Sequence, residues 1–323
     1  IRAIDNADNL GDAATLGNFW VDITAPTPAG NLAGDQSTSV WSNNPTVNFS
    51  WTPASDMLSG LDGYESSAGP LAAAATGTPH TFMGDGASHS FDLTALDAAG
   101  NQSSTETIGP FWIDNTPPES ASDLTSDQAP NVWTNDPDFL FTWTAATDAT
   151  SGIAGYDSTG DGLMDLGDVT TTLRSYADSD GDTFALTPFD FAGNMGPPIA
   201  LGEFMVDTVL PNGITDFTSS QNADEWTNDE NFSFGWSSAT DDRSGLAGYD
   251  ITGDEEADLP ATSNGRNVPF PEGDANEFTI AALDNAGNIE PGQTFGPYKV
   301  DLTNPDAATG LSADLAIETW SNN

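Results

Sequence analysis

Aspartate residues recur at two fixed positions of a repeating sequence pattern. Their spacing could bring several carboxylates close together. One set begins an Asp-x-x-Gly-Asn turn or its equivalent, and the other precedes a proline-containing phrase. The first set is Asp5, Asp97, Asp190 and Asp284, and the second set is Asp22, Asp114, Asp207 and Asp301. Calcium takes about six to eight oxygen ligands, mainly carboxylates and carbonyls. Both sets are therefore candidate calcium ligands, while the alternative is that Asp and Asn serve only as turn residues.

The two aspartates of one repeat lie 17 residues apart, as Asp97 and Asp114 do. A strand pair runs between them, so we expect both carboxylates to reach the same end of one β-sandwich. Two like charges about 4 Å apart repel by roughly 4 kcal/mol at an effective dielectric constant near 20. A divalent cation would remove that repulsion and stiffen the junction. A halophilic surface solvated at high monovalent salt is the alternative explanation of the acidity.

A second acidic pattern has the spacing of an EF-hand-type calcium loop. Oxygen-bearing residues stand at loop positions 1, 3, 5, 9 and 12, Gly162 stands at position 6, and position 7 offers a backbone carbonyl. The candidate ligands are Asp157, Thr159, Asp161, Leu163, Asp165 and Asp168. Without helical flanks, the segment resembles a thrombospondin type 3 or dockerin loop placed between strands. The alternative is a solvated acidic hairpin.

The same pattern returns in part further along the chain. Its candidate calcium ligands are Asp250, Thr252, Asp254 and Asp258, but Glu255 replaces the glycine and Ala261 stands in the last position. The corresponding residues nearer the N-terminus are not expected to bind this way; they are Glu65, Ser67 and Gly69. A further acidic stretch, residues 178–182, is expected to be a plain exposed loop.

The elements that must position these aspartates form an array. Both aspartate sets step by 92, 93 and 94 residues, and so do Trp41, Trp133, Trp226 and Trp320. A period of this size is that of one small domain. We expect the end of a repeat at 1–22, whole repeats at 23–114, 115–207 and 208–301, and the start of another at 302–323. The chain is then a partial window on a longer array.

Short alternating segments inside each repeat predict β-strands. Val47, Phe49 and Trp51 alternate at period two and therefore share one face. The segments 139–143 and 232–236 show the same alternation. No segment keeps a helical period. About seven short strands in roughly 93 residues predict an all-β fold of tandem immunoglobulin-like β-sandwich domains. Proline at each junction stiffens the linkers, so we expect an extended array.

The composition limits the function further. The 323 residues carry 50 acidic side chains against five Lys plus Arg, a formal net charge of −45. So few cations cannot form the basic patch that nucleic acid requires. The chain has no Cys and no apolar run of the length of a membrane span, so we expect no disulfide, no thiolate metal site and no membrane span.

Catalysis finds little support in the sequence. His80 and His89 are the only histidines, and no nucleophile-elbow phrase accompanies them. Paired carboxylates that recur with the array favour a structural role over glycoside cleavage in a single cleft. The Trp residues alternate with Phe, which favours core packing over stacking on sugars. We expect that the chain is not an enzyme.

Three motifs recur in a fixed order: the Asp-x-x-Gly-Asn turn, the Val-Asp-x-Thr-x-Pro junction, and an Asp-x-x-Ser-Gly loop that leads to Gly-Tyr. The last motif contains Asp56, Asp148 and Asp241. Together they resemble the bacterial immunoglobulin-like repeats of large surface adhesins. The resemblance implies calcium at domain junctions, bound by the aspartates of the first two motifs.

The expected function is a calcium-stiffened stalk of an extracellular, cell-surface protein. The expected partners are neighbouring repeats, other copies through strand or edge pairing, and a glycan or another surface ligand. One alternative is a subunit that assembles into an extracellular filament or surface layer through unpaired strand edges. Another is a set of accessory or carbohydrate-binding modules of a secreted enzyme.

Overall fold

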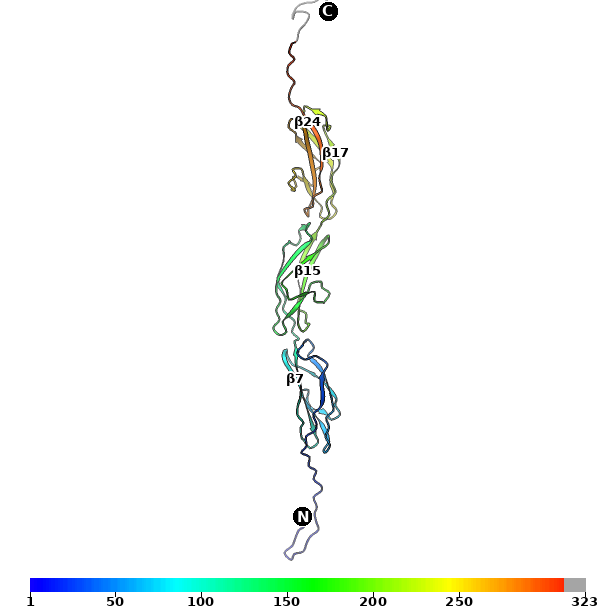
Figure 1. Ribbon diagram of the computed structural model, residues 1–323, viewed down its shortest axis with the longest axis vertical. Helices are drawn as coiled ribbons and strands as arrows, with labels where there is room; N and C mark the ends of the chain where they lie inside the picture. The colour runs from blue at the N-terminus through cyan, green and yellow to red at the C-terminus, as the bar shows by residue number, and fades with distance from the viewer. Residues whose placement is uncertain (311–323) are drawn as a thin grey trace, which may run out of the picture. The chain divides into compact units, whose positions relative to one another are not determined.

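The structure, a computed structural model, describes residues 1–310. These residues form β-strands and turns, and none of them is helical (Figure 1). Hence no helix in this range has the length and apolar character to cross a membrane. Trp320, which marks the predicted start of a further repeat, lies outside the described residues. The chain separates into two compact units, of which the first holds residues 1–125, 142–171 and 184–200. The second holds residues 126–141, 172–183 and those from 201 onward.

The first repeat contains eight strands. They are β1 (Gly30–Gly34), β2 (Trp41–Ser42), β3 (Thr46–Thr52), β4 (Leu61–Ser66), β5 (Leu71–Ala72), β6 (Gly77–Thr81), β7 (Gly86–Asp97) and β8 (Glu106–Ile113). One sheet has the order β1-β3-β6, and the other has the order β2-β8-β7-β4-β5. All pairs in these sheets are antiparallel except β2 and β8, which run parallel.

The later repeats have the same element order. The second repeat contains β9 (Ser122–Ser126), β10 (Trp133–Thr134), β11 (Asp138–Thr144), β12 (Ile153–Asp157), β13 (Leu166–Gly167), β14 (Thr171–Ser175), β15 (Ser179–Asp190) and β16 (Ile199–Val206). The third repeat contains β17 (Thr215–Ser219), β18 (Trp226–Thr227), β19 (Asn231–Ser237), β20 (Leu246–Asp250), β21 (Leu259–Pro260), β22 (Gly265–Pro269), β23 (Gly273–Asp284) and β24 (Gln293–Val300). Labels in Figure 1 mark β7, β15, β17 and β24. The two sheets of the second repeat have the orders β10-β16-β15-β12-β13 and β14-β11-β9. Those of the third repeat have the orders β18-β24-β23-β20-β21 and β17-β19-β22.

The all-β fold class predicted from the sequence is confirmed, with repeated sandwiches and eight strands in place of about seven. The alternating pattern explains the packing, because successive strand residues point to opposite faces. In β3, Val47, Phe49 and Trp51 are buried while the residues between them are exposed. The corresponding positions of β11 and β19 are buried in the same alternation. These three tryptophans are core residues, as predicted.

A buried tyrosine holds the loop that follows the central strand. The hydroxyl of Tyr64 on β4 accepts a hydrogen bond from the backbone N–H of Ala54 at 2.9 Å. Tyr156 and Tyr249 make the equivalent bonds, each at 3.0 Å. The phenol therefore fixes the segment that carries the Asp-x-x-Ser-Gly motif, which becomes important at the site described below.

Candidate metal centres

Three clusters of aspartates, which we call the junction triads, lie where one repeat leads into the next. Their members are Asp22, Asp56 and Asp97; Asp114, Asp148 and Asp190; and Asp207, Asp241 and Asp284. In each triad, one carboxylate oxygen per residue lies within 4.8 Å of the others. Each triad combines a junction aspartate, an aspartate of the Asp-x-x-Ser-Gly loop, and a turn aspartate. Six of the predicted ligands are thus gathered, together with three that the prediction omitted.

The predicted pairing of Asp97 with Asp114 is wrong. Asp97 ends β7 and Asp114 follows β8, and these two strands are antiparallel. Gly86 at the start of β7 faces Ile113 at the end of β8, so the two aspartates lie at opposite ends of the sandwich. The turn aspartate therefore meets the junction aspartate of the preceding repeat.

The turn aspartate is held by its own turn. Asp97 Oδ1 accepts the backbone N–H groups of Ala99 and Asn101, and its Oδ2 accepts the Asn101 side-chain amide at 2.8 Å. Gly100 has φ of +90°, a left-handed conformation that glycine adopts at little cost. Asn101 also donates to the backbone carbonyl of Asp22 at 3.2 Å. This asparagine therefore connects the turn to the preceding linker, and Asn194 and Asn288 do so at 2.9 and 2.8 Å.

The loop aspartates are the residues that sequence reasoning missed as ligands. Asp148 Oδ1 accepts the backbone N–H groups of Thr150, Ser151 and Gly152. Asp56 and Asp241 occupy equivalent positions. The signal was present, because this aspartate occurs at the same place in all three whole repeats. The resemblance to adhesin repeats implies calcium only at the aspartates of the other two motifs.

The junction aspartate joins the linker to the next sandwich. Asp114 Oδ1 accepts the backbone N–H of Thr116 at 3.0 Å, and its Oδ2 accepts that of Ser151 at 3.0 Å. Asp22 and Asp207 accept the corresponding serine N–H groups, of Ser59 and Ser244, at 2.9 and 3.0 Å. Hydrogen bonds thus connect this carboxylate to its own linker and to one loop of the following repeat.

Burial makes the charge of the triads costly. Asp114 and Asp207 are fully buried, and Asp97, Asp190 and Asp284 are each 2% exposed. Lys299, the single lysine of the sequence, forms a salt bridge with exposed Asp224 and not with a triad. Buried charges normally require a partner of opposite sign or a metal. Burial raises the pKa of Asp97, but its surroundings, above all the side-chain and backbone hydrogen bonds from Asn101, outweigh that effect and leave the pKa below its ordinary value.

A serine hydroxyl accompanies each triad. Ser151 is 9% exposed, and its buried Oγ has no hydrogen-bond partner; the buried Oγ of Ser59 has none either. An unsatisfied buried hydroxyl costs about 1–3 kcal/mol, so it calls for an explanation. Carboxylates and a hydroxyl form an all-oxygen donor set, which suits a hard cation such as Ca²⁺. The triads therefore fit the metal that the sequence predicted.

Asp5 and Asp301 belong to no metal-compatible group within the described residues. Asp5 nevertheless forms the expected turn, accepting the N–H groups of Ala7 and Asn9 and the Asn9 amide. Asp8 takes the left-handed position there with φ of +62°, although it is not glycine. Asp301 Oδ1 accepts the backbone N–H of Thr303 at 3.0 Å.

The EF-hand-like loop gathers three of its predicted carboxylates, Asp157, Asp161 and Asp165. Asp157 is 3% exposed and accepts backbone N–H groups from Thr159, Gly160 and Gly162. Asp165 and Asp161 are exposed. Burial raises the pKa of Asp157, and the backbone donors outweigh that effect and lower it.

Asp168 lies apart from this cluster. The loop closes when Leu166 and Gly167 pair with Tyr156 and Gly155, so the chain has already entered β13 before position 168. Asp168 follows the end of β13, beyond the point where the loop closes. The EF-hand-type spacing places position 12 in the same loop, whereas here the loop closes into β13 before that position. The backbone carbonyl of Leu163 remains a predicted ligand.

The loop of the third repeat has the same local geometry, with Asp250, Asp254 and Asp258 gathered. Glu255 has φ of +65° and donates its backbone N–H to Asp250 Oδ2 at 2.9 Å. It therefore fills the place of Gly162, which has φ of +81° and donates to Asp157 Oδ2 at 2.8 Å. The Thr252 hydroxyl donates to Asp258 at 3.0 Å. We refer to the two gathered sets as the loop clusters.

The acidic stretch 178–182 is not a plain exposed loop. Residues 179–182 begin β15, and Asp178 accepts both the N–H and the hydroxyl of Thr208. Asp85 holds Asn115 and Thr116 in the same way, and Glu272 holds Thr303. This acidic position fastens the start of each linker to the sandwich that precedes it.

The histidines flank an aromatic core residue. Ring centroids of His80 and His89 lie 4.9 and 5.0 Å from that of Phe82. Burial lowers the pKa of His80, and nearby His89 lowers it further. Both histidine rings therefore pack against the side chain of Phe82.

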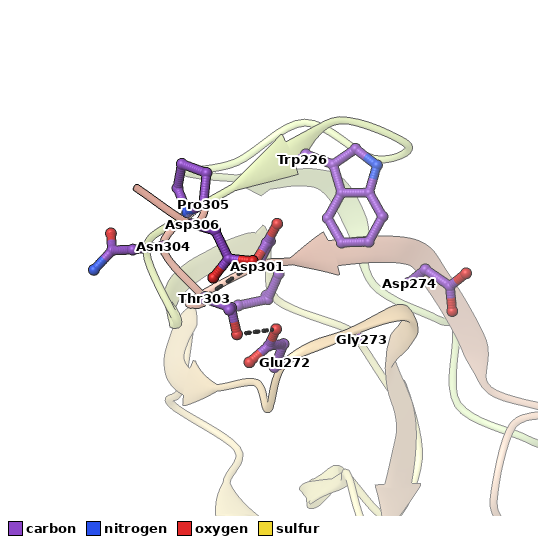
Figure 2. A pocket seen from close by; sticks show the side chains of 10 residues that line it. Trp226, Glu272, Gly273, Asp274, Asp301, Thr303, Asn304, Pro305 and Asp306 are labelled. Atoms are coloured by element: carbon purple, nitrogen blue, oxygen red, sulfur yellow. Dashed lines mark hydrogen bonds between the residues drawn. The ribbon is translucent and has the colours of Figure 1, made fainter. Parts of the chain in front are cut away.

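An open cavity of about 610 Å³ lies at the end of the third repeat. Figure 2 shows the exposed ring of Trp226 at one side, with Asp274 near it and Glu272 bonded to Thr303. Trp226 is 61% exposed, whereas the equivalent Trp41 and Trp133 are half-buried. The cavity thus offers an aromatic face and several carboxylates, and no basic residue lines it.

Fold and site together define tandem β-sandwich modules with acidic junctions. No family model matches the chain. It is 27% identical to Exoglucanase B of Cellulomonas fimi over 341 residues, covering 98% of this chain and 29% of that protein. It is 30% identical to Exoglucanase A of the same organism, covering 83% of this chain and 31% of the relative. It is 33% identical to Chitinase A1 of Niallia circulans, covering 54% of this chain and 25% of the relative.

The chain thus spans less than a third of the length of these relatives. Among solved structures, the fibronectin(III)-like modules of Clostridium thermocellum CbhA match with 12% identity and a TM-score of 0.35, over 55% of this chain and 94% of theirs. The FN1-FN3 domains of chicken CNTN1 match with 12% identity and a TM-score of 0.25, over 84% of this chain and 98% of theirs. None of these proteins is named as an adhesin, so that resemblance stays a prediction.

Proposed function

We propose that the chain is a non-catalytic set of accessory modules in an extracellular, polysaccharide-degrading enzyme. The observation that carries the proposal is the likeness to Exoglucanase B, which extends along 98% of this chain but covers 29% of that relative. A region of that extent leaves room for catalytic parts elsewhere. The repeated, all-aspartate clusters support a structural role, because a single active site has no need to recur with every repeat.

Calcium is the cofactor we propose for the junction triads, and the loop clusters are the second set of candidate sites. At a junction, the three carboxylates come from the linker and from two loops of the next sandwich. A bound cation would neutralise the triad and so hold the linker against that sandwich. Extracellular modules bind Ca²⁺ with dissociation constants of about 10⁻⁴–10⁻³ M. At ten times that constant, each site adds about 1.4 kcal/mol of stability.

The test of the accessory role uses the chain itself. The purified chain is incubated with cellulose and with chitin, and released sugars are measured with and without calcium. We expect no hydrolysis, and a melting temperature that rises with calcium and falls with chelator. Hydrolysis by the isolated chain would overturn the proposal.

A second candidate role, glycan contact, rests on the cavity beside Trp226. An exposed indole can stack on a sugar ring, and Glu272 and Asp274 can accept hydrogen bonds from sugar hydroxyls. Binding of cello- and chito-oligosaccharides is measured by calorimetry for the chain and for Trp226→Ala. Trp133→Ala is the control, because Trp133 is the half-buried equivalent. Equal binding by all three proteins would remove this role.

The surface stalk predicted from the sequence is the remaining candidate, and the same triads favour it. Fractionation of cells that produce the parent protein distinguishes the two settings. Retention on the cell surface favours the stalk, and release into the medium favours the enzyme accessory.

A further inference from the structure

Each junction triad is approached by one serine from the Asp-x-x-Ser-Gly loop. The backbone N–H of that serine donates to the junction aspartate at 2.9–3.0 Å. The side-chain oxygen behaves differently. In Ser59 and Ser151 it is buried and has no hydrogen-bond partner, and in Ser244 it makes one long contact of 3.4 Å to Asp241.

The direction of the hydroxyl is clearest in the third triad. Ser244 Oγ lies 3.4 Å from Asp241 Oδ1, so this side chain faces a carboxylate of its triad. A hydroxyl carries one proton and two lone pairs, so it can donate to a carboxylate and still present oxygen to a cation.

A purely structural serine would be expected to use its hydroxyl. Acceptor oxygens are abundant around Ser151, because three carboxylates converge beside it, yet its Oγ is unpaired while 91% of the residue is buried. Buried polar groups are rarely left without a partner. A cation among the three carboxylates would supply that partner.

We propose that the hydroxyl oxygens of Ser59, Ser151 and Ser244 are ligands of the junction cation, beside the three carboxylates of each triad. This inference rests on the proposed calcium-binding role of the triads. It makes the Asp-x-x-Ser motif a two-ligand unit, in which the loop aspartate and the serine three residues later bind one ion. The ligand set is then four side chains from three separated segments.

Ser151→Ala tests the proposal in the second junction. Calcium binding is measured by calorimetry for the wild-type chain, for Ser151→Ala and for Thr150→Ala, a control that removes a hydroxyl one residue away. Asp114→Asn identifies which calorimetric site is this junction. We expect Ser151→Ala to weaken that site by about tenfold and Thr150→Ala to leave it unchanged. The melting temperature of Ser151→Ala in chelator should match that of the wild type.

Ser151→Cys supplies a readout that a structural role would not give. The chain has no Cys, so any thiolate absorption arises from the introduced residue. Soft thiolate ligands prefer soft metals, so this variant should lose calcium affinity while gaining cadmium affinity. A cadmium–thiolate charge-transfer band should appear at one equivalent and disappear when Asp114→Asn is added.

The outcomes separate the two proposals. If the wild-type chain binds no calcium at a site removed by Asp114→Asn, the proposed metal role fails. If it binds, and Ser151→Ala binds equally well without a cadmium–thiolate band in Ser151→Cys, only the serine assignment fails. Should Ser151→Ala not fold, Ser59→Ala and Ser59→Cys give the same two readouts in the first junction, with Asp22→Asn as the identifying variant.

Discussion

The junction triads and the loop clusters are both sets of three aspartates, but they are built differently. A triad draws on three segments far apart in sequence, as Asp114, Asp148 and Asp190 show, and its members are mostly buried. A loop cluster draws on nine consecutive positions, from Asp157 to Asp165, and only its first member is buried. One is a product of the tertiary fold, and the other is a local turn.

The difference determines how much each depends on a cation. The exposed carboxylates of a loop cluster keep contact with water, and Asp157 is satisfied by three backbone N–H groups. The triads hold like charges in a more buried setting, and in the first two an unpaired serine hydroxyl lies beside them. We therefore expect calcium to matter more for the stability of the junctions than for that of the loops.

The largest expected effect comes from neutralising a buried triad residue. Asp114→Asn removes one of three mutually repelling charges, so in chelator the variant should be more stable than the wild type. In calcium the order should reverse, because the variant loses a ligand. Like charges at the observed spacing repel by roughly 3 kcal/mol at a dielectric constant near 20, and screening reduces the observable change to about 1–2 kcal/mol. Urea denaturation in each condition measures it, and a variant less stable in both would contradict the account.

The matched change in a loop cluster is Asp161→Asn, at an exposed position. Its stability in chelator should lie within about 0.5 kcal/mol of the wild type. A crossover as large as that of Asp114→Asn would remove the distinction between the two kinds of site.

The glycine of the loop cluster gives the next largest effect. Gly162→Ala places a side chain at φ of +81°, which should cost about 1 kcal/mol. Glu255→Gly makes the opposite change at φ of +65° and should stabilise the third repeat by about 0.5–1 kcal/mol. Paired denaturation curves measure both changes. The two changes in the free energy of unfolding should have opposite signs. Equal signs would show that backbone strain does not distinguish the two loops.

Lowering the pH should test the contact between Asp178 and Thr208 of the linker, and the expected effect on stability is smaller. Backbone and side-chain hydrogen bonds from Thr208 lower the pKa of Asp178, so its folded pKa lies below that of the unfolded chain. Its stabilisation is then present above the ordinary aspartate pKa and is lost as pH falls through the folded value. Wild type and Asp178→Asn should differ at neutral pH and converge once the pH falls below the folded pKa. A difference that does not change with pH would exclude this contribution.

The smallest effect is expected at Asp168, which stands beyond the point where the loop closes. Asp168→Ala should leave calcium binding and stability unchanged within about 0.5 kcal/mol, because the residue is outside the cluster. Calorimetry with Asp165→Asn as the positive comparison measures this. Loss of the loop site in Asp168→Ala would restore the EF-hand-like ligand set.

Much of the fold could be predicted from sequence because its signals are local and repeated. Alternation in β3, β11 and β19 identified strands and their buried faces, and the aspartates of the loop clusters could be predicted from their spacing. The triads could not be predicted in the same way. Whether Asp97 meets Asp114 or Asp22 depends on strand direction, which no local pattern records. The position of Asp168 outside the cluster has a related cause, since the chain turns into β13 before that residue.

Calcium titration of the loop-aspartate variants tests the central claim most directly. Asp56, Asp148 and Asp241 became candidate ligands only when the fold placed them in the triads. The wild-type chain and the variants Asp56→Asn, Asp148→Asn and Asp241→Asn are titrated by calorimetry under identical conditions. Each variant should lose one binding site and keep the others. An unchanged number of sites in all three would contradict the assignment of the junction triads as metal centres.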